Sequence, residues 1–333
     1  MQELDLSTIN NMLIVRFSSL GDILLTTPLI RSLKKQYPNL NIDFLLREEY
    51  ADALEYNKNI NTLFLLKRDE RETELLKRMN DVNYDLIIDL QNNIRSRRIT
   101  KKMNGKIQKF KKPFIKKFLL VKFKINLLKY QTQIPYRYAE AIPRFQLDNE
   151  GLDLYLPDQN KHDDNEVHNI VGFCPGSRHF TKQWPMEYFI ELGNLLRGNG
   201  IDVALFGGRE DIDVCEKIAE QISGAVNLSN DNNLFKTAYE MKRCKLILCN
   251  DSGLMHTAAA LRVPVIAIFG STVKEFGFAP YKSKNLILEN NLLSCRPCSH
   301  IGRSKCPEGH FKCMKELTAE NIYEKFINYF NSL

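Results

Sequence analysis

The chain has 333 residues, 44% of them hydrophobic, and a formal net charge of +7. This length and composition are typical of a soluble globular protein with two domains of ordinary size, which excludes extensive disorder. Apolar runs such as VPVIAIF (263–269) are far shorter than the roughly 20 residues of a membrane-spanning helix, and the N-terminal MQELDLSTIN lacks the pattern of a secretory signal, so we expect a cytoplasmic protein.

The first half of the chain alternates apolar segments with segments of helical periodicity. Strands are predicted at MLIVRF (12–17), NIDFLL (41–46), TLFLL (62–66) and YDLIIDL (84–90), and helices at about 23–36, near Ala51 and at about 72–79. This alternation is typical of a parallel sheet with crossover helices.

Positive charge is concentrated in the middle of the chain. Between Leu90 and Ala139 there are fifteen Lys or Arg residues and no Asp or Glu, so the +7 total leaves a net charge of −8 for the rest. Segment 95–124 interleaves its cations with phenylalanines, which suits an anionic lipid surface, a phosphorylated acceptor or nucleic acid. A solvated basic face is an equally good interpretation.

A hydrophilic, acidic stretch at 158–169 is the natural linker to a second series of strands and helices. The strands are predicted at NIVGFC (169–174), IDVALF (201–206), AVNLS (225–229), KLILC (245–249) and VPVIAIF (263–269), and the helices after Pro185 and at about 211–222, 235–242 and 253–261. We therefore expect an α/β protein of GT-B architecture, in which two Rossmann-like domains face a central cleft. The expected parts are an N-terminal domain (1–157), the linker (158–169), a C-terminal domain (170–317) and a final helix (318–333) that packs back on the N-terminal domain.

Two polar turns about two hundred residues apart each close an apolar strand and open a helix. They are RFSSLGD (16–22) and CNDSGLMH (249–256). Ligands bind at such strand ends in open α/β sheets, so each turn predicts a binding site. No G-x-G-x-x-G follows the first strand, which counts against a dinucleotide-dependent dehydrogenase.

Five segments in order carry a resemblance that covers nearly the whole chain. They are RFSSLGDILLTTPLIRSLKKQYP (16–38), PGSRHFTKQWP (175–185), FGGREDIDVCEKIA (206–219), NDSGLMHTAAAL (250–261) and IAIFGST (266–272). Together they resemble the bacterial ADP-heptose:lipopolysaccharide heptosyltransferases of glycosyltransferase family 9. The resemblance implies an inverting, metal-independent transfer of heptose from ADP-heptose to a lipopolysaccharide inner-core acceptor. It also implies acceptor binding in the N-terminal domain and nucleotide-sugar binding in the C-terminal domain.

Asp22 is the expected general base, because a carboxylate is needed to take the proton of the acceptor hydroxyl. Ser18, Ser19 and Gly21 are expected to form the acceptor loop around it. Ser19 and Asp22 also fit the capping-box pattern S-x-x-[DE], so from the residues alone a helix cap is the better interpretation. The resemblance reverses that preference, and one carboxylate can serve both roles.

Lys182, in the loop before Trp184, is expected to neutralise the departing diphosphate. A cation is mildly unfavourable at the start of a helix, which favours a functional role over an exposed lysine. Ser177 and Thr181 are expected to donate hydrogen bonds to the same phosphates.

The remaining donor-binding residues follow the strands of the second half. Glu210 is expected to accept the ribose hydroxyls, although it also suits a helix start, and the resemblance places Asn232 in the adenine pocket. In the NDSG turn, Asp251 orients the sugar or the loop, and the amides of Ser252, Gly253 and Leu254 hold phosphate at a helix N-terminus. His256 is assigned to donor contact, although a histidine one turn into a helix is more often packed. Asp211 and Asp213 are interpreted as helix-start charges, so no D-x-D metal pair is expected.

The eight cysteines fall into two groups. Four are scattered on predicted strands and helices, where buried, reduced thiols are expected. Cys295, Cys298, Cys306 and Cys313 cluster at spacings that suit a structural zinc or iron ion, and reduced thiols without a metal are an equally good interpretation.

The expected partners are ADP-heptose and an anionic lipid A or inner-core acceptor, reached at the inner face of the cytoplasmic membrane through segment 95–124. No nucleic acid and no catalytic cofactor are expected. The rival hypotheses are a sugar-nucleotide epimerase of the same architecture, a glycosyltransferase with another donor or a protein or capsule acceptor, and a noncatalytic protein that binds nucleic acid.

Overall fold

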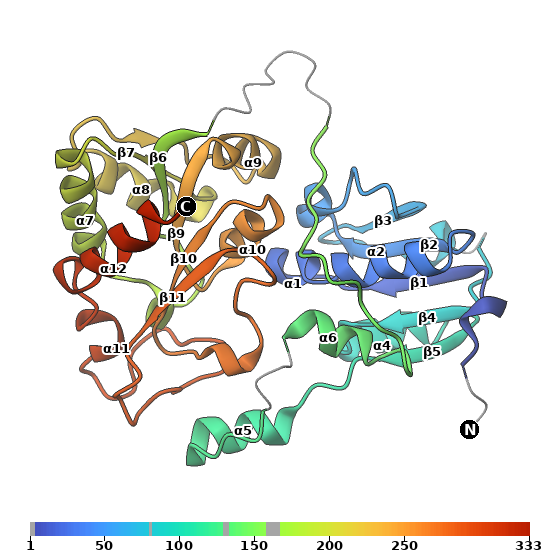
Figure 1. The fold of residues 1–333 in the computed structure, drawn as a ribbon. Helices are drawn as coiled ribbons and strands as arrows, with labels where there is room; N and C mark the ends of the chain where they lie inside the picture. The colour runs from blue at the N-terminus through green and yellow to red at the C-terminus, as the bar shows by residue number, and fades with distance from the viewer. Residues whose placement is uncertain (1–3, 80–81, 129–132, 158–166) are drawn as a thin grey trace. The chain divides into compact units, whose positions relative to one another are not determined.

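The computed structural model describes residues 4–79, 82–128, 133–157 and 167–333, and the chain divides into two compact units (Figure 1). Unit 1 is formed by residues 1–112 and 134–155, and unit 2 by 113–133 and 156–333. The segment 113–133, expected in the N-terminal domain, therefore belongs to unit 2. Most of the expected linker, 158–166, lies outside the described residues, and its last two positions already belong to the first strand of unit 2.

Unit 1 contains a five-stranded parallel sheet in the order β3-β2-β1-β4-β5. Its strands are β1 (Asn11–Val15), β2 (Asn41–Arg47), β3 (Thr62–Leu66), β4 (Leu86–Asp89) and β5 (Lys106–Lys109). The chain moves outward from β1 to β2 and β3 and then returns to the other side of β1. The strand order therefore reverses between β1 and β4, which is where ligands bind in folds of this kind.

The helices of unit 1 are short. They are α1 (Leu20–Leu24), α2 (Thr27–Gln36), α3 (Glu72–Arg78), α4 (Ile94–Thr100) and α6 (Ile134–Ala139), with 3-10 turns η1 (Leu6–Thr8) and η2 (Glu48–Ala53). The single helix expected over 23–36 is interrupted, because the hydroxyls of Thr26 and Thr27 donate to the carbonyls of Ile23 and Leu24 and Pro28 begins the next helix. This break isolates α1 as a short element directly after β1.

Unit 2 contains a six-stranded parallel sheet in the order β11-β10-β9-β6-β7-β8. Its strands are β6 (His168–Cys174), β7 (Asp202–Leu205), β8 (Val226–Asn227), β9 (Cys244–Asn250), β10 (Val265–Phe269) and β11 (Asn285–Glu289). Here the strand order reverses between β6 and β9. The sequence analysis did not predict β5 or β11, which both lie at the edge of a sheet.

Helices cover both faces of the sheet of unit 2 (Figure 1). Helices α7 (Met186–Gly198), α8 (Ile212–Ala219) and α12 (Ala319–Asn331) pack on one face, and α9 (Leu234–Lys242) and α10 (Gly253–Ala260) on the other. Unit 2 also contains α5 (Phe114–Phe123), which packs apart from the sheet, α11 (Lys312–Lys315), and 3-10 turns η3 (Phe180–Lys182), η4 (Arg209–Asp211) and η5 (Lys274–Phe276). Successive strand residues enter different cores: Leu246 and Leu248 pack with α7 and α8, whereas Ile247 and Cys249 pack with α9 and α10.

The C-terminal helix α12 belongs to unit 2. Ile322, Phe326 and Phe330 are buried in the core that α7 and α8 also share. The expectation that this helix packs back on the N-terminal domain is therefore corrected: its apolar stripe is satisfied within unit 2. Across the parts of the chain that the structure describes, none of the helices combines the length and apolar character that crossing a bilayer requires.

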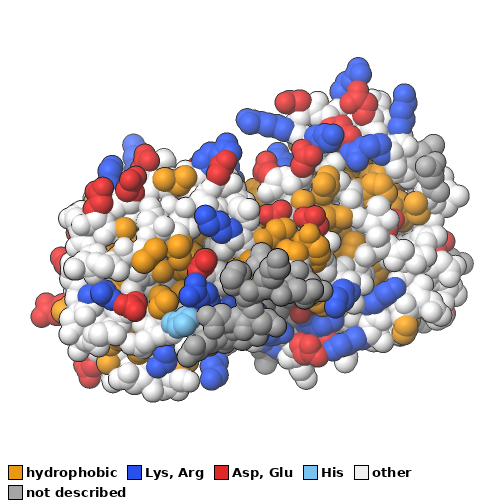
Figure 2. Space-filling view, turned by 90° about the horizontal axis from the view of Figure 1, so that it is seen from above, with side chains coloured by type: hydrophobic (Ala, Val, Ile, Leu, Met, Phe, Trp, Pro, Cys, Tyr) orange, Lys and Arg blue, Asp and Glu red, His pale blue; other side chains and the backbone are white. Residues whose placement is uncertain are grey.

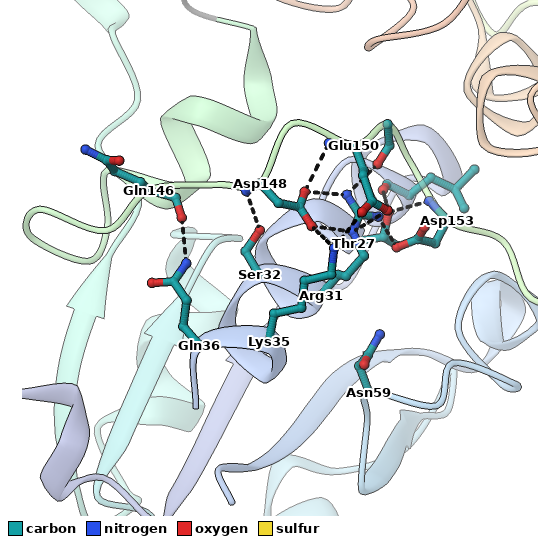
Figure 3. Close-up of polar contacts among 12 residues, drawn as sticks. Thr27, Arg31, Ser32, Lys35, Gln36, Asn59, Gln146, Asp148, Glu150 and Asp153 are labelled. Atoms are coloured by element: carbon teal, nitrogen blue, oxygen red, sulfur yellow. Dashed lines mark hydrogen bonds and ion pairs between the residues drawn. The ribbon is translucent and has the colours of Figure 1, made fainter. Parts of the chain in front are cut away.

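A cluster of ion pairs fastens the end of unit 1 to α2 (Figure 3). The buried guanidinium of Arg31 lies 2.8 Å from the Asp148 carboxylate, pairs with Asp153 and donates to the Gly151 carbonyl. Lys35 reaches Asp148 and Glu150 from the next turn of α2. Burial raises the pKa of Asp148, but hydrogen bonds from Arg31 and Lys35 outweigh it and hold that pKa well below its usual range.

Replacing Arg31 by Met should lower the free energy of unfolding by about 3 kcal/mol, because two largely buried carboxylates lose their cation. Lys35→Met is the matched control; its side chain is 50% exposed, so water screens its ion pairs and the loss of stability should be much smaller than in Arg31→Met. Urea unfolding of both variants is the measurement, and equal losses would contradict a special role for Arg31.

The same variants carry a pH signature. A carboxyl whose pKa is lower in the folded state stabilises the fold fully above its unfolded pKa of about 4, and this stabilisation is lost as the pH falls below that value. The acid-side loss of stability should therefore be smaller in Arg31→Met than in the unchanged protein.

Candidate active site

In unit 1, the turn that follows β1 lies beside the end of β4, because Val15 and Asp89 are partners in the sheet. Asp22 sits in α1, just after this turn, with a side chain that is 19% exposed. One carboxylate oxygen lies 2.7 Å from Nη2 of Arg16 and accepts a hydrogen bond from the Tyr138 hydroxyl at 3.3 Å. The other accepts from the backbone N–H and hydroxyl of Ser19 at 3.3 and 3.0 Å. Asp22 thus caps α1 and is also held by a cation.

Arg16 organises the turn around Asp22. Its Nε donates to the Ser18 carbonyl and its Nη1 donates to the Leu90 carbonyl after β4, both at 2.9 Å. The guanidinium also lies 5.6 Å from the ring centroid of Tyr138, in a cation–π arrangement. Gly21 is buried within α1. Of the predicted loop residues, Ser18 therefore contacts Arg16 and Ser19 contacts Asp22.

Three neighbours of this site were missed by the sequence analysis. Burial raises the pKa of Tyr138, so its hydroxyl stays protonated and donates. Lys112 donates to the carbonyls of Gln91 and Asn92 at 2.6 and 3.2 Å, and its desolvation lowers its pKa. Buried Asp89 accepts from the backbone N–H of Asn92 at 2.7 Å. The residues around Asn92 are thereby held at the end of β4, next to the Arg16 turn.

In unit 2, the loops after β6 and β9 start side by side, because Cys174 and Cys249 are partners in the sheet. The ammonium of Lys182, in the first loop, lies 2.7 Å from the carboxylate of Asp251, in the second. The two side chains are 15% and 8% exposed. Thr272 donates to the same Asp251 oxygen at 2.7 Å. Two sequence-predicted residues therefore meet at the point where the strand order reverses.

The Lys182 loop is anchored by backbone contacts. The buried side chain of Asn250 accepts from the N–H of Trp184 at 3.0 Å and donates to the Pro175 carbonyl at 2.7 Å, so it joins both ends of the loop to β9. The hydroxyl of Thr181 accepts from the N–H of Arg303 at 2.8 Å and donates to its carbonyl at 3.3 Å. Thr181 therefore supports the loop, and the structure does not present its hydroxyl to a phosphate. Ser177 is half-buried at the start of the same loop.

The first turn of α10 begins directly after Asp251. Ser252 is its N-cap, and its buried hydroxyl forms no hydrogen bond with the residues that the structure describes. The N–H groups of Gly253 and Leu254 belong to the first turn, which leaves donors for an anion beside the Lys182 ammonium. His256 is buried in the same helix and is packed among its neighbours.

The other predicted donor residues lie at the ends of β7 and β8. Glu210 is exposed in η4, and the exposed Asn232 accepts from the N–H of Arg209 at 3.1 Å. Asp211, interpreted from the sequence as a helix-start charge, caps η4: its half-buried carboxylate accepts from the N–H of Gly208 at 3.2 Å, and desolvation raises its pKa. The loop after β6 packs directly on it, since a Cβ at Gly176 would lie 2.2 Å from the Asp211 carboxyl carbon.

The described residues give no support for a metal site at the cysteines. Among the described residues, no group of three or more His, Cys, Asp or Glu side chains is placed to hold an ion. Cys295 Sγ lies 3.9 Å from His310 Nε2, and burial raises the pKa of Cys298 and Cys313. The structural zinc or iron considered for Cys295, Cys298, Cys306 and Cys313 is therefore unsupported. The other four, Cys174, Cys215, Cys244 and Cys249, are buried free thiols, as predicted.

The model of glycosyltransferase family 9 (heptosyltransferase) matches residues 73–308. The chain belongs to this family. It is 26% identical to the lipooligosaccharide heptosyltransferase 2 of Haemophilus influenzae over 358 aligned residues, covering 95% of this chain and 98% of that one.

Solved structures confirm the fold, two parallel-sheet α/β units of the GT-B type. A family 9 glycosyltransferase from Veillonella parvula superposes with a TM-score of 0.80 at 23% identity, covering 100% of this chain and 99% of that one. An E. coli heptosyltransferase solved with ADP superposes with a TM-score of 0.71 at 20% identity, covering 96% and 99%. This protein is therefore a glycosyltransferase with the fold of the heptosyltransferases.

Gly176→Ala should push Asp211 away from the Gly208 N–H and lower the free energy of unfolding by about 1–3 kcal/mol. Gly198→Ala, at the end of α7, is the matched control: nothing lies within 4 Å of its added Cβ, so the variant should be up to about 1 kcal/mol more stable. Thermal unfolding of both variants is the measurement. If the two changed alike, the close packing of the two loops would not constrain Gly176.

Proposed function

We propose that this glycosyltransferase moves heptose from ADP-heptose to a lipopolysaccharide inner-core acceptor. The observation that carries the proposal is the pairing of Lys182 with Asp251 at the first turn of α10 in unit 2. An ammonium beside free backbone N–H groups is suited to a diphosphate. The family match, the ADP in the E. coli heptosyltransferase structure and the name of the Haemophilus influenzae relative support heptose and ADP as the parts of the donor.

In the proposed reaction, an oxygen of the acceptor forms a bond to the anomeric carbon of heptose. The bond from that carbon to the diphosphate oxygen breaks, and ADP leaves with the electron pair. Asp22 takes the proton of the acceptor hydroxyl, so the displacement occurs in one step with inversion at the anomeric carbon. Lys182 and the amides of α10 meet the negative charge that accumulates on ADP, so no divalent metal is required.

The contacts of Asp22 bear on this role. Four donors, from Arg16, Tyr138 and Ser19, hold the carboxylate in one orientation. Proton transfer to it becomes favourable as the acceptor oxygen bonds to carbon and its acidity rises. Arg16 and Tyr138 are therefore positioning residues in this proposal.

The other donor contacts are proposals of the same kind. Glu210 holds the ribose, Asn232 lines the adenine pocket, and Ser177 and Ser252 donate to the phosphates. Ser18 and Ser19 line the acceptor side of Asp22. An acceptor built on lipid A resides in a membrane, so the enzyme works at the inner face of the cytoplasmic membrane.

Asp22→Asn should lower kcat by about 10²–10⁴-fold, because the amide keeps the cap oxygen but cannot take a proton. The affinity for ADP-heptose should be unchanged, since the proposed donor contacts lie in unit 2. Asp5→Asn is the matched control: Asp5 caps η1 with an exposed carboxylate in the same unit, and the variant should keep full activity.

The assay is ADP release from ADP-heptose by the purified protein, with and without a Kdo-containing lipid A acceptor. Release that requires the acceptor and fails in Asp22→Asn supports both the transfer and the base. An altered sugar nucleotide formed without an acceptor would favour the epimerase hypothesis, and full activity of Asp22→Asn would reduce Asp22 to a helix cap.

Lys182→Met should lower kcat by about 10²–10³-fold, because the leaving diphosphate loses its cation. Lys236→Met is the matched control, an exposed lysine in the first turn of α9 of the same unit, and it should leave turnover unchanged. Turnover by the unchanged protein in excess EDTA tests whether Lys182 or a divalent metal ion neutralises the leaving diphosphate. Full activity is expected, and a loss of activity that Mg²⁺ restores would contradict the role of Lys182.

A further inference from the structure

Helix α5 exposes large apolar side chains. Phe114, Ile115 and Phe118 are 68%, 75% and 60% exposed, and Phe114 and Ile115 each lie about one turn before Phe118 on the same side of the helix. Phe123, Ile125 and Leu127 continue the exposure just beyond it. Among the described residues, six of the fourteen exposed large apolar side chains therefore fall within 114–127, which is a concentration that scattered surface residues do not produce.

This exposure does not arise from a detached helix. The opposite side of α5 is packed in unit 2, where Leu120 and Leu128 form a small core with Phe276. The ammonium of Lys124, at the C-cap, donates to the carbonyls of Cys295 and Pro297 at 3.0 and 2.8 Å. The inner side of α5 is thus packed and hydrogen-bonded within unit 2, and these contacts keep its outer side exposed.

The charged residues of this part of the chain have one sign. Exposed Lys116 and Lys122 lie on α5, and the sequence contains no acidic residue from Leu90 to Ala139. The face of the molecule drawn in Figure 2 differs, because Lys and Arg are interspersed there with Asp and Glu. An exposed apolar helix whose only charged residues are lysines suits a partner that is apolar inside and anionic outside.

The first part of the basic segment, residues 95–112, combines exposed cations with few exposed apolar side chains. Residues 95–112 belong to unit 1, where Arg95 donates to the Glu70 carbonyl and Arg97 to the Asn92 side chain. Its exposed cations, such as Lys101 and Lys106, have no cluster of exposed apolar neighbours like that of α5. The apolar and the cationic features coincide only in the part that belongs to unit 2.

We infer that the outer side of α5 docks on an anionic lipid bilayer, with Phe114, Ile115 and Phe118 inserted among the acyl chains and Lys116 and Lys122 at the headgroups. The inference deepens the proposed function, on which it rests for the lipid-borne acceptor, by naming the surface that meets the membrane. A second copy of the chain is a poorer occupant, because two such surfaces would bring like charges together. Nucleic acid offers phosphates that the lysines can contact, but it offers no apolar environment for the exposed aliphatic side chain of Ile115.

The test is co-sedimentation of the purified protein with vesicles of phosphatidylcholine and with vesicles containing 30% phosphatidylglycerol. The unchanged protein should prefer the anionic vesicles, and F114S/I115S/F118S should weaken that binding by at least about tenfold, because the inserted apolar area is lost. K116Q/K122Q should weaken it less and reduce its salt dependence. K101Q/K106Q is the matched control, with two exposed lysines of unit 1 in the same basic segment, and should bind within about twofold of the unchanged protein.

Circular dichroism and transfer to an acceptor oligosaccharide without acyl chains check that each variant is folded. Intact soluble transfer with lost vesicle binding supports the inference. Unchanged vesicle binding of F114S/I115S/F118S, or a loss as large in K101Q/K106Q, overturns it and leaves the proposed function standing. Tighter retention on single-stranded RNA than on anionic vesicles, abolished by the α5 variants, would overturn it in favour of nucleic acid. Vesicle binding without any transfer would instead contradict the proposed function alone.

Discussion

The reversal of strand order in each parallel sheet is the constraint on which the candidate site depends. At the reversal, two neighbouring strands send their following segments to opposite faces of the sheet, so their carboxyl ends are left uncovered. In unit 1 this occurs at β1 and β4, and in unit 2 at β6 and β9. The Asp22 cluster and the Lys182–Asp251 pair lie at these two places. Hydrophobic strands buried on both faces fix the sheets, and the sheets in turn fix where polar groups can gather.

Both clusters are held by charges that would be costly if they were left alone. Arg16 is almost fully buried and is satisfied by Asp22 and by two carbonyls, and Asp251 is satisfied by Lys182 and Thr272. Such pairing keeps the groups oriented before a ligand arrives, so little rearrangement is needed during reaction. Ion pairs with Arg31 hold the segment from Asp148 to Asp153 against α2 in the same way, and there the effect is purely structural.

Much of the fold could be predicted from the sequence because the central strands are continuous apolar runs. Edge strand β5, with the sequence KIQK, lacks such a run and was missed. The apolar stripe of α12 indicates that one side is buried but not what covers it, which is why its partner was wrong. Asp22, Lys182 and Asp251 could be singled out because they follow strands in recognisable turns, and their roles stay predictions. Tyr138 lies 116 residues from Asp22, and nothing in the local sequence links the two. Thr181 was assigned to phosphate because a hydroxyl in a loop reveals neither its partner nor its burial.

The account rests on a single displacement in which Asp22 takes the acceptor's proton while ADP leaves. The most direct test is the anomeric configuration of the newly formed glycosidic bond, determined by NMR on the product of ADP-heptose and acceptor. The account predicts one product whose configuration is opposite to that of the donor. A product with the donor's configuration would contradict it, because retention requires either a covalent intermediate or attack from the side of the leaving group, and neither is served by a base at Asp22.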